Sequence, residues 1–576
     1  MFFQKKAGRD GAGVYDDRQD REKSIAEHLK NARRARAEMD RYWNKMRAYY
    51  DGTHASLRET ALFLDEMHLP WQPAVSTDGF IQVESQIERE LPDFSFSGRD
   101  VIWDEDREKA RQREHIVRYV LDRNDMEFKN IRNERRLNLY GTAIWKVSYS
   151  EGERAGGDSG DIVIENPSPA QIFPDPTASD VDGCEYIACV YRMNRQRALR
   201  LFDRDLKAAG LSPDDLFQQN RTPRRTDSDS LSRMLFDCGY ELYDENTDTV
   251  EVVEWWFRQP QDGSFALSYD SGEGRTEESV IQYRAGDIAL SVLIGGREVR
   301  YLPKFWSRTD CSMFPFVIYN KTPREDSVFG KSELEPIIPL IDATDRQLAF
   351  AQLNAAFSAS DVILAEENAF ADADMPDCSP GAVWKLRPGM IDCVRRLGNL
   401  SSESAAHYDI ADRYRALIRE TTGNYDFLQN DDLSQMKTAT GLALLSERAE
   451  RRTLTKNADK YAAFARLLRL VDYMALENFS YSKIVQIGAA PDTSMVYGFG
   501  DIAEMGYVPQ LDVRVLTGGS ASSLRSYALS VLSDLLSADI SETNYLFVKS
   551  IAELSDLPMR KEICDLLDAK FAPKKL

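Results

Sequence analysis

The chain has 576 residues, of which 43% are hydrophobic and 10% aromatic, and its formal net charge at pH 7 is −21. This composition supports several packed cores and excludes a wholly disordered chain. The acidic balance argues against a sequence-independent DNA clamp, because such clamps hold phosphates with Lys and Arg. An acidic protein can still surround DNA without gripping it, since a negative wall repels phosphate.

The cysteines and the hydropathy of the chain indicate a reducing compartment and no membrane span. The spacing of the cysteines favours packed, reduced thiols over a disulfide framework or a zinc site. Residues 1–13 lack the long apolar stretch of a signal peptide, and no run of about 18 apolar residues occurs, so we expect no membrane span. The seven cysteines, an odd number without a CxxC pair, are Cys184, Cys189, Cys238, Cys311, Cys378, Cys393 and Cys564.

After a polar start over residues 1–20, the first part of the chain is predicted to be helical. Apolar residues spaced three and four apart predict helices over residues 21–51, 77–91 and 105–140. The third of these mixes Arg and Glu, which is typical of a solvated face or a subunit contact. The first carries a stripe that we expect to face a core: Met39, Tyr42, Trp43, Met46 and Tyr49.

From Gly141 the pattern changes to strands rich in Ile, Val, Trp and Tyr, broken by proline and glycine turns. Residues 195–210 return to a helical pattern, and residues 212–230 are predicted to be an exposed polar loop. The front half of the chain is therefore predicted to be α+β. The predicted strand regions are residues 141–150, 160–193, 249–258 and 281–320.

Residues 330–441 have the most distinctive order of parts. Helices over residues 330–360 and 401–423 flank a short β-rich insertion, residues 360–400, and a polar loop follows over residues 424–440.

Two prolines mark where the first of these helices begins. Pro336 and Pro339 lie near its start, where a missing N–H costs little. A helix from there to Ser358 would have about 20 residues and a length of about 30 Å. Its narrow apolar stripe indicates packing against copies of itself or against a partner helix. The stripe consists of Ile337, Ile341, Leu348, Ala351 and Ala355.

The last part of the chain is predicted to be mainly helical, and it contains no internal repeat. Residues 440–479 form the longest helical pattern, residues 496–518 are expected to be strand and turn, and residues 520–571 are expected to be short helices. The stripe of the long helix consists of Tyr461, Phe464, Leu468, Val471 and Ala475.

No catalytic, cofactor-binding or metal-binding residue is predicted. The Gly330-Lys331-Ser332 triplet suggests a phosphate loop, but Glu325 stands where that motif needs a glycine. The acidic cluster between Asp175 and Glu185 has the wrong spacing for a calcium loop and is expected to be a turn with Asx hydrogen bonds. The five histidines do not form HExxH, and no GxSxG occurs. An acidic intracellular enzyme with an unrecognised site therefore remains only an alternative.

Four stretches, in order, resemble the portal proteins of tailed bacteriophages. YGTAIWKV (residues 140–147) is similar to the strand after the first helices, and NPSPAQIFPDPTASDVDGCEYI (166–187) to a proline-rich segment that ends in a DP turn. FGKSELEPIIPLIDATDRQLAFAQLN (329–354) resembles the G-x-S-x-L-E start of a helix with a central aspartate, here Asp342. TATGLALLSERAERR (438–452) resembles the start of the long wing helix. The order and spacing of the four carry the resemblance.

The resemblance implies a portal-type α+β fold with a helical stem, a mixed α/β wing, a small β-containing clip and an α-helical crown. The stem helices would be residues 330–359 and 401–423, the clip residues 360–400 and the tunnel loop residues 424–440. The wing would comprise residues 1–329 and 441–519, and the crown residues 520–576.

In the clip, residues 362–365 and 382–386 are apolar, strand-like runs, and we expect them to pair with the neighbouring subunit, which would cover their edges. A rigid polar rim suits partners that must be exchanged. The clip residues expected to face partners are Glu366, Glu367, Asp372, Asp374, Asp377, Trp384, Lys385 and Arg387.

The tunnel loop is acidic and rich in short polar groups, which suits sliding contact with a moving duplex. Its 17 residues, counted from 424 to 440, are long for a plain connection. Lys437 is its one cation and the best candidate for a phosphate contact. The residues expected to face DNA are Gln429, Asn430, Asp431, Asp432, Ser434, Gln435 and Lys437.

By this resemblance the chain is not an enzyme. It forms a homo-oligomeric ring, usually of twelve copies, at one capsid vertex of the virion and assembles in the host cytoplasm. Double-stranded DNA passes through the ring during packaging and ejection. The expected partners are the large terminase, a head–tail adaptor, and the major capsid and scaffold proteins, with no membrane. Another head–tail component is the second alternative, although adaptors are generally much shorter.

Overall fold

The computed structural model describes residues 3–4, 18–54, 74–88, 91–92, 94–98, 104–150, 160–209, 211, 249–270, 276–309, 311–359, 363–366, 385–390, 393–396, 404–422, 457–479, 484–487, 495–498 and 511–515. The chain divides into two compact units. The first comprises residues 1–89, 122–433 and 473–479, and the second residues 90–121, 434–472 and 480–576. Mixed helices and strands confirm the α+β class.

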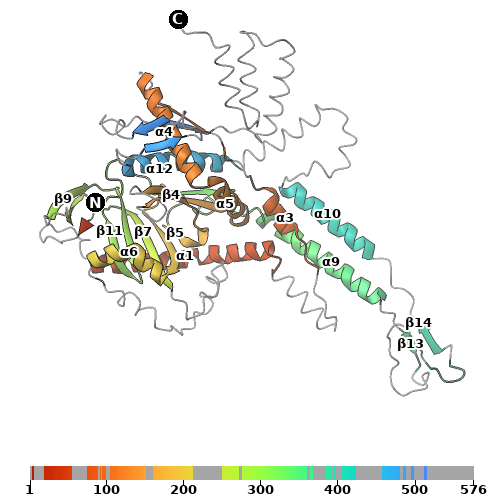
Figure 1. The fold of residues 1–576 in the computed structure, drawn as a ribbon. Helices are drawn as coiled ribbons and strands as arrows, with labels where there is room; N and C mark the ends of the chain where they lie inside the picture. Colours follow the sequence, from red (N-terminus) through yellow and green to blue (C-terminus); the bar gives the residue numbers. More distant parts are fainter. Residues whose placement is uncertain are drawn as a thin grey trace, which may run out of the picture. The chain divides into compact units, whose positions relative to one another are not determined.

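A five-stranded antiparallel sheet, ordered β11-β10-β7-β6-β5, is the largest sheet of the first unit (Figure 1). All seven residues of β10 are buried, so both faces of the sheet are covered along this strand. The predicted strand over residues 249–258 is confirmed as β7. The strands are β5 (Ile172–Pro174), β6 (Tyr186–Asn194), β7 (Thr249–Arg258), β10 (Ile288–Ile294) and β11 (Arg297–Leu302).

Helix α1 (Arg18–Tyr50) packs against this sheet and confirms the helix predicted over residues 21–51. Ile25, Leu29 and Ala32 of α1 share a core with Trp255 of β7. The predicted stripe is also confirmed, because its members Trp43, Met46 and Tyr49 are buried and Met39 and Tyr42 are partly buried in two further cores.

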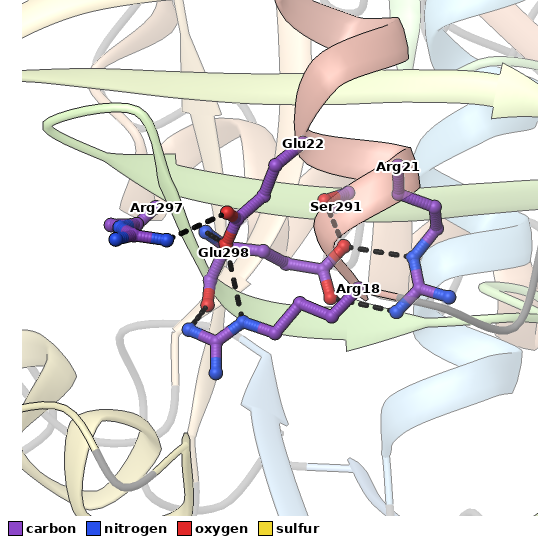
Figure 2. Close-up of polar contacts among 6 residues, drawn as sticks. All are labelled: Arg18, Arg21, Glu22, Ser291, Arg297 and Glu298. Atoms are coloured by element: carbon purple, nitrogen blue, oxygen red, sulfur yellow. Dashed lines mark hydrogen bonds and ion pairs between the residues drawn. The ribbon is translucent and has the colours of Figure 1, made fainter.

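The first turns of α1 are held to β10 and β11 by charged groups (Figure 2). Glu298 on β11 is 3% exposed and accepts hydrogen bonds from Arg21 Nε at 3.0 Å and Nη2 at 2.8 Å. Ser291 Oγ donates to the same carboxylate at 2.9 Å, and the Glu298 N–H donates to Glu22 at 2.8 Å. The N-terminal ion cluster consists of Arg18, Arg21, Glu22, Ser291, Arg297 and Glu298.

A second sheet, ordered β12-β3-β4, is antiparallel and deeply buried. Its strands are β3 (Thr142–Ser150), β4 (Asp161–Glu165) and β12 (Phe316–Asn320). Helix α5 (Met126–Tyr140) packs on β3, where Asn133 Nδ2 donates to the Ile144 carbonyl at 3.0 Å.

The two sheets meet at a buried ion pair. Lys146 Nζ on β3 lies 2.8 Å from Glu254 on β7, and Tyr191 OH donates to the same carboxylate at 2.9 Å. Burial alone would raise the pKa of Glu254, but the Lys146 ammonium together with the hydrogen bonds from Lys146, Tyr191 and Trp256 lowers it. Burial alone would lower the pKa of Lys146, but Glu254, with smaller effects of Cys189, Glu165 and Tyr191, raises it well above its ordinary value. The pair is therefore charged over the neutral pH range.

The helix predicted over residues 105–140 is divided in the structure. Helix α4 (Asp104–Arg123) ends before Asp125, whose φ of 49° is left-handed, and α5 begins at Met126. The break lets the Asn124 side chain bond strand β4: Nδ2 donates to the Ile162 carbonyl and Oδ1 accepts from the Ile164 N–H, each at 2.9 Å. One continuous helix would lose these bonds.

Most described charged residues of this stretch are exposed or partly exposed, as predicted for a solvated face, but two are buried. Arg113 is buried and pairs with buried Asp472, with Nε 2.8 Å from Oδ1, so its partner lies within the chain. Glu134 is buried as well.

Smaller elements complete the first unit. Helix α6 (Arg195–Ala209) confirms the helix predicted there, and α3 (Asp78–Ser85) is shorter than the predicted 77–91, since a tighter turn from Glu84 to Ile87 ends it. A three-stranded sheet, β1-β8-β9, contains β1 (Phe3–Gln4), β8 (Gly263–Asp270) and β9 (Thr276–Tyr283), of which β1 and β8 were not predicted.

In the second unit, strand β2 (Phe94–Gly98) pairs with β17 (Leu511–Val515), and β15 (Ile484–Ile487) pairs with β16 (Met495–Gly498). Helix α12 (Ala458–Asn478) buries Phe464, Leu468, Val471 and Ala475 of the predicted stripe, with Tyr461 partly buried.

Residues 473–479, which include the end of α12, belong to the first unit, and there the Glu477 carboxylate accepts the N–H groups of Ser307, Arg308 and Thr309 at 2.6–3.0 Å. Both hydroxyls of this turn also donate to it, at 2.5 and 3.0 Å. The predicted loop over residues 212–230 and the predicted helices over residues 520–571 lie outside the described residues.

Candidate functional site: a helical hairpin with a β insertion

The candidate site is built on helices α9 (Ile338–Ala359) and α10 (Ser404–Thr422), which lie side by side in the first unit (Figure 1). They confirm the two helices predicted on either side of an insertion. A short 3-10 turn, η3 (Glu335–Ile337), leads into α9, so Pro336 and Pro339 both lie at its start, where no helical N–H is needed.

An apolar core holds the base of the hairpin. Ile337 at the end of η3 and Ile341 near the start of α9 share a buried cluster with Ile418 near the end of α10, and Tyr49 of α1 joins it. The prediction that α9 packs against a partner helix is therefore confirmed. Ile337, Ile341, Leu348 and Ala351 of the predicted stripe are buried, whereas Ala355 is exposed because it lies beyond this core.

Polar contacts fasten α9 to the chain around it. His54 Nε2 lies 2.9 Å from Asp345 Oδ2, and the Ser76 N–H donates to Asp345 Oδ1 at 2.7 Å. Tyr49 OH donates to Asp342 at 2.9 Å, and its ring stacks on His54 with centroids 4.2 Å apart. The sequence pointed to Asp342 but not to His54 or Asp345. His54 precedes Asp345 by about 290 residues, so no local sequence pattern links the two.

The second helix has its own attachments. Arg415 Nε lies 3.5 Å from Asp78 on α3, and His407 Nδ1 lies 2.7 Å from Gln347 Oε1 on α9. Burial raises the pKa of Asp78 although Arg415 opposes that rise. The hairpin is therefore anchored at its base on both sides.

The insertion contains strands β13 (Ile363–Ala365) and β14 (Val394–Arg396), which pair antiparallel with each other beyond the end of α9 (Figure 1). Residues 362–365 were expected to pair with a neighbouring subunit, and this expectation is wrong for the edge that β14 covers. A chain that leaves α9 and returns to α10 must reverse, and the reversal brings residues 363–365 beside residues 394–396. The predicted run over residues 382–386 lies mostly outside the described residues.

Three of the predicted clip residues lie within the described residues. Glu366, Lys385 and Arg387 are all exposed, and the turn that follows Arg387 has Gly389 at a φ of +87°. The other clip residues, Glu367, Asp372, Asp374, Asp377 and Trp384, lie outside them. The whole predicted tunnel loop, residues 424–440 with Lys437, also lies outside them.

The Gly330-Lys331-Ser332 triplet has a structural role. The Gly330 N–H donates to Thr142 Oγ1 at 2.9 Å. Ser332 donates twice, from its N–H to the Tyr42 hydroxyl of α1 at 2.8 Å and from its Oγ to the Asn138 carbonyl of α5 at 3.2 Å. Gly330 lies so close to the Gly141 and Thr322 carbonyls that an added Cβ would lie 2.6–2.7 Å from them. The triplet is thus a close backbone contact.

The acidic turn is held as predicted by Asx-type bonds: Thr177 N–H and Oγ1 donate to Asp175 at 2.9 and 2.7 Å, and Gly183 N–H donates to Asp180 at 2.6 Å. Among the described residues, no group of three or more His, Cys, Asp or Glu side chains is placed to hold a metal ion. None of the described helices is long and apolar enough to cross a membrane.

The comparison with known families agrees with this arrangement. The family model of phage P22-like portal proteins matches residues 79–435, a segment that contains β3, the proline-rich turn and the whole α9–α10 hairpin. None of the curated proteins matches the chain. A match over more than half of the sequence defines the class as a portal protein of tailed phages.

The chain belongs to the phage P22-like portal protein family. Members of this family are structural, non-enzymatic components of the phage capsid, and the family implies an oligomeric ring.

Proposed function

We propose that the chain forms a ring of twelve copies at one capsid vertex, through which DNA is packaged and later ejected. The observation that supports this most is the α9–α10 hairpin with its strand pair, because it lies in the segment matched by the family model. In this proposal α9 (residues 330–359 with the turn before it) and α10 (residues 401–423) are the stem, and residues 360–400 are the clip.

The anchoring of the hairpin fits a wall that must keep its shape while DNA moves past. Contacts at its base from His54 to Asp345 and from Asp78 to Arg415 fix each helix separately. Rigid elements hold a shared opening more accurately than loops do. The acidic composition fits a passage that does not bind phosphate, and residues 424–440 are proposed as the loop that faces the duplex.

The clip is proposed to bind the large terminase during packaging and a head–tail adaptor afterwards. Its exposed charges Glu366, Lys385 and Arg387 belong to a polar rim, which suits partners that exchange. The remainder of the chain is proposed as wing (residues 1–329 and 441–519) and crown (residues 520–576), facing capsid and scaffold proteins.

Ring formation is tested by negative-stain microscopy and mass photometry of the purified protein, alone and with scaffold protein. Rings with a central hole are the expected result. A protein that stays monomeric under all of these conditions would contradict the proposal.

Partner docking is tested separately on assembled rings. The double substitution Lys385→Glu/Arg387→Glu is expected to weaken terminase binding about tenfold or more, because rim charges steer and orient the encounter. Lys23→Glu, an exposed cation on α1, is the matched control and should bind as wild type. Equal binding by all three proteins would remove the clip from the proposed interface.

A further inference from the structure

Two groups of apolar side chains on the first unit remain 37–49% exposed, although Phe80 of one also contacts the Tyr50 ring and Phe350 of the other the His407 ring. The α3 patch consists of Val75, Phe80 and Ile81, which are 42%, 47% and 49% exposed. Phe80 and Ile81 lie in the first turn of α3 and are exposed, whereas Val83 on the same helix is buried. Single exposed apolar residues are normal on a protein surface, but three within seven residues form a patch that requires an explanation.

The α10 patch consists of Phe350 on α9 with Ile410 and Leu417 on α10, which are 43%, 37% and 45% exposed. Ile410 and Leu417 are seven residues apart and therefore lie on one line along the helix. The Phe350 ring lies 5.9 Å from that of His407, one turn before Ile410, so it continues the same surface onto α9.

The α10 patch lies on the side of α10 opposite to α3. Arg415 pairs with Asp78, so α3 lies beside the Arg415 side of α10. Leu417 follows Arg415 by two residues and is therefore turned about 200° around the helix axis. The α10 patch thus faces away from α3.

A closed ring needs this arrangement. Each subunit in a ring meets its two neighbours through two different surfaces, whereas a self-complementary patch would give only a dimer. We propose that the α3 patch of one copy packs on the α10 patch of the next copy, so the occupant of both is this same chain. This inference rests on the ring of the proposed function and specifies which residues close it.

The first test is assembly. Ile81→Asp and Leu417→Asp are each expected to abolish rings and leave folded subunits with the wild-type far-UV circular dichroism spectrum, since both side chains are exposed. Phe128→Asp is the control, because Phe128 on α5 is 76% exposed and belongs to neither patch. If Ile81→Asp and Leu417→Asp both form rings as wild type does, the patches are not the ring contact.

The second test uses disulfide formation in assembled rings to show whether the α3 patch of one copy contacts the α10 patch of the next. The double variant Ile81→Cys/Leu417→Cys should give a ladder of covalent multimers on non-reducing gels, above the background of wild type. Each single variant alone should give no covalent dimer, while rings assembled from a mixture of the two should give dimers and nothing larger.

The outcomes separate the two proposals. Rings of wild-type size without a ladder, or dimers from either single variant alone, would overturn the pairing of the two patches and leave the ring itself standing. A wild-type protein that never forms rings would refute the proposed function, and with it the pairing.

Discussion

Replacing Arg21 by Met tests how the N-terminal ion cluster fixes α1 to the sheet. The substitution keeps an unbranched side chain but removes both charged donors to Glu298, at 2.8 and 3.0 Å. The Glu298 carboxylate, 3% exposed, would keep Ser291 Oγ as its side-chain donor. Breaking a buried pair in this way costs about 3–5 kcal/mol, because one charge stays buried without its partner.

The assay is urea unfolding of unassembled subunits at one protein concentration, because assembly itself stabilises a folded subunit. Lys23→Met is the matched control: its partner Asp20 is 3.4 Å away and both side chains are more than half exposed, so a change within about 0.5 kcal/mol is expected. The double variant Arg21→Met/Glu298→Met should be more stable than Arg21→Met alone, since Glu298 no longer leaves a buried charge without its partner.

An Arg21→Met protein that unfolds at the same urea concentration as Lys23→Met would refute this reasoning. It would mean that Glu298 finds water or another donor at no cost in stability.

Three further predictions concern other buried contacts. Glu254 has a lowered pKa and Lys146 a raised one, so the stability of wild type relative to Lys146→Met/Glu254→Met should stay constant near neutral pH. It should fall as pH drops below about 4.5, where Glu254 gains a proton, and again as pH rises above about 10.5, where Lys146 loses one. A wild type whose relative stability is greatest in acid would contradict the pair. His54→Phe keeps the ring stacking on α1 but leaves Asp345 one donor short, so unfolding free energy should fall by about 1–3 kcal/mol, measured by urea unfolding; an unchanged midpoint would exclude the contact. Glu477→Gln keeps the shape but halves the accepting oxygens, so amide hydrogen exchange of residues 307–309 should quicken about tenfold or more, and unaltered protection would show that the carboxylate does not hold this turn.

The sequence predicted the hairpin well because its signals are local. Pro336 and Pro339 mark the start of α9, and the spacing of Ile337, Ile341 and Leu348 gives its buried face. The strand pattern of β7 is equally local, and its predicted bounds agree with the structure.

What the sequence could not show depends on distant partners or single backbone angles. Arg113 is buried only because Asp472, 359 residues later, neutralises it. Nothing in the composition around Asp125 requires the left-handed φ that divides α4 from α5; the reason is strand β4, which bonds Asn124. Strand β13 pairs with residues 394–396 because the insertion folds back on itself, and three-residue strands carry too little alternation to show it.

The central claim is that copies of this chain close into a ring with the α9–α10 hairpins around one axis. Cryo-electron microscopy of the assembled protein, at a resolution that resolves helices and counts subunits, tests it most directly. The account predicts a closed ring in which neighbouring hairpins line a hole wide enough for a duplex and the strand pairs β13–β14 lie together at one end of it. Hairpins spread around the outside of the particle, or an assembly with no central hole, would contradict it.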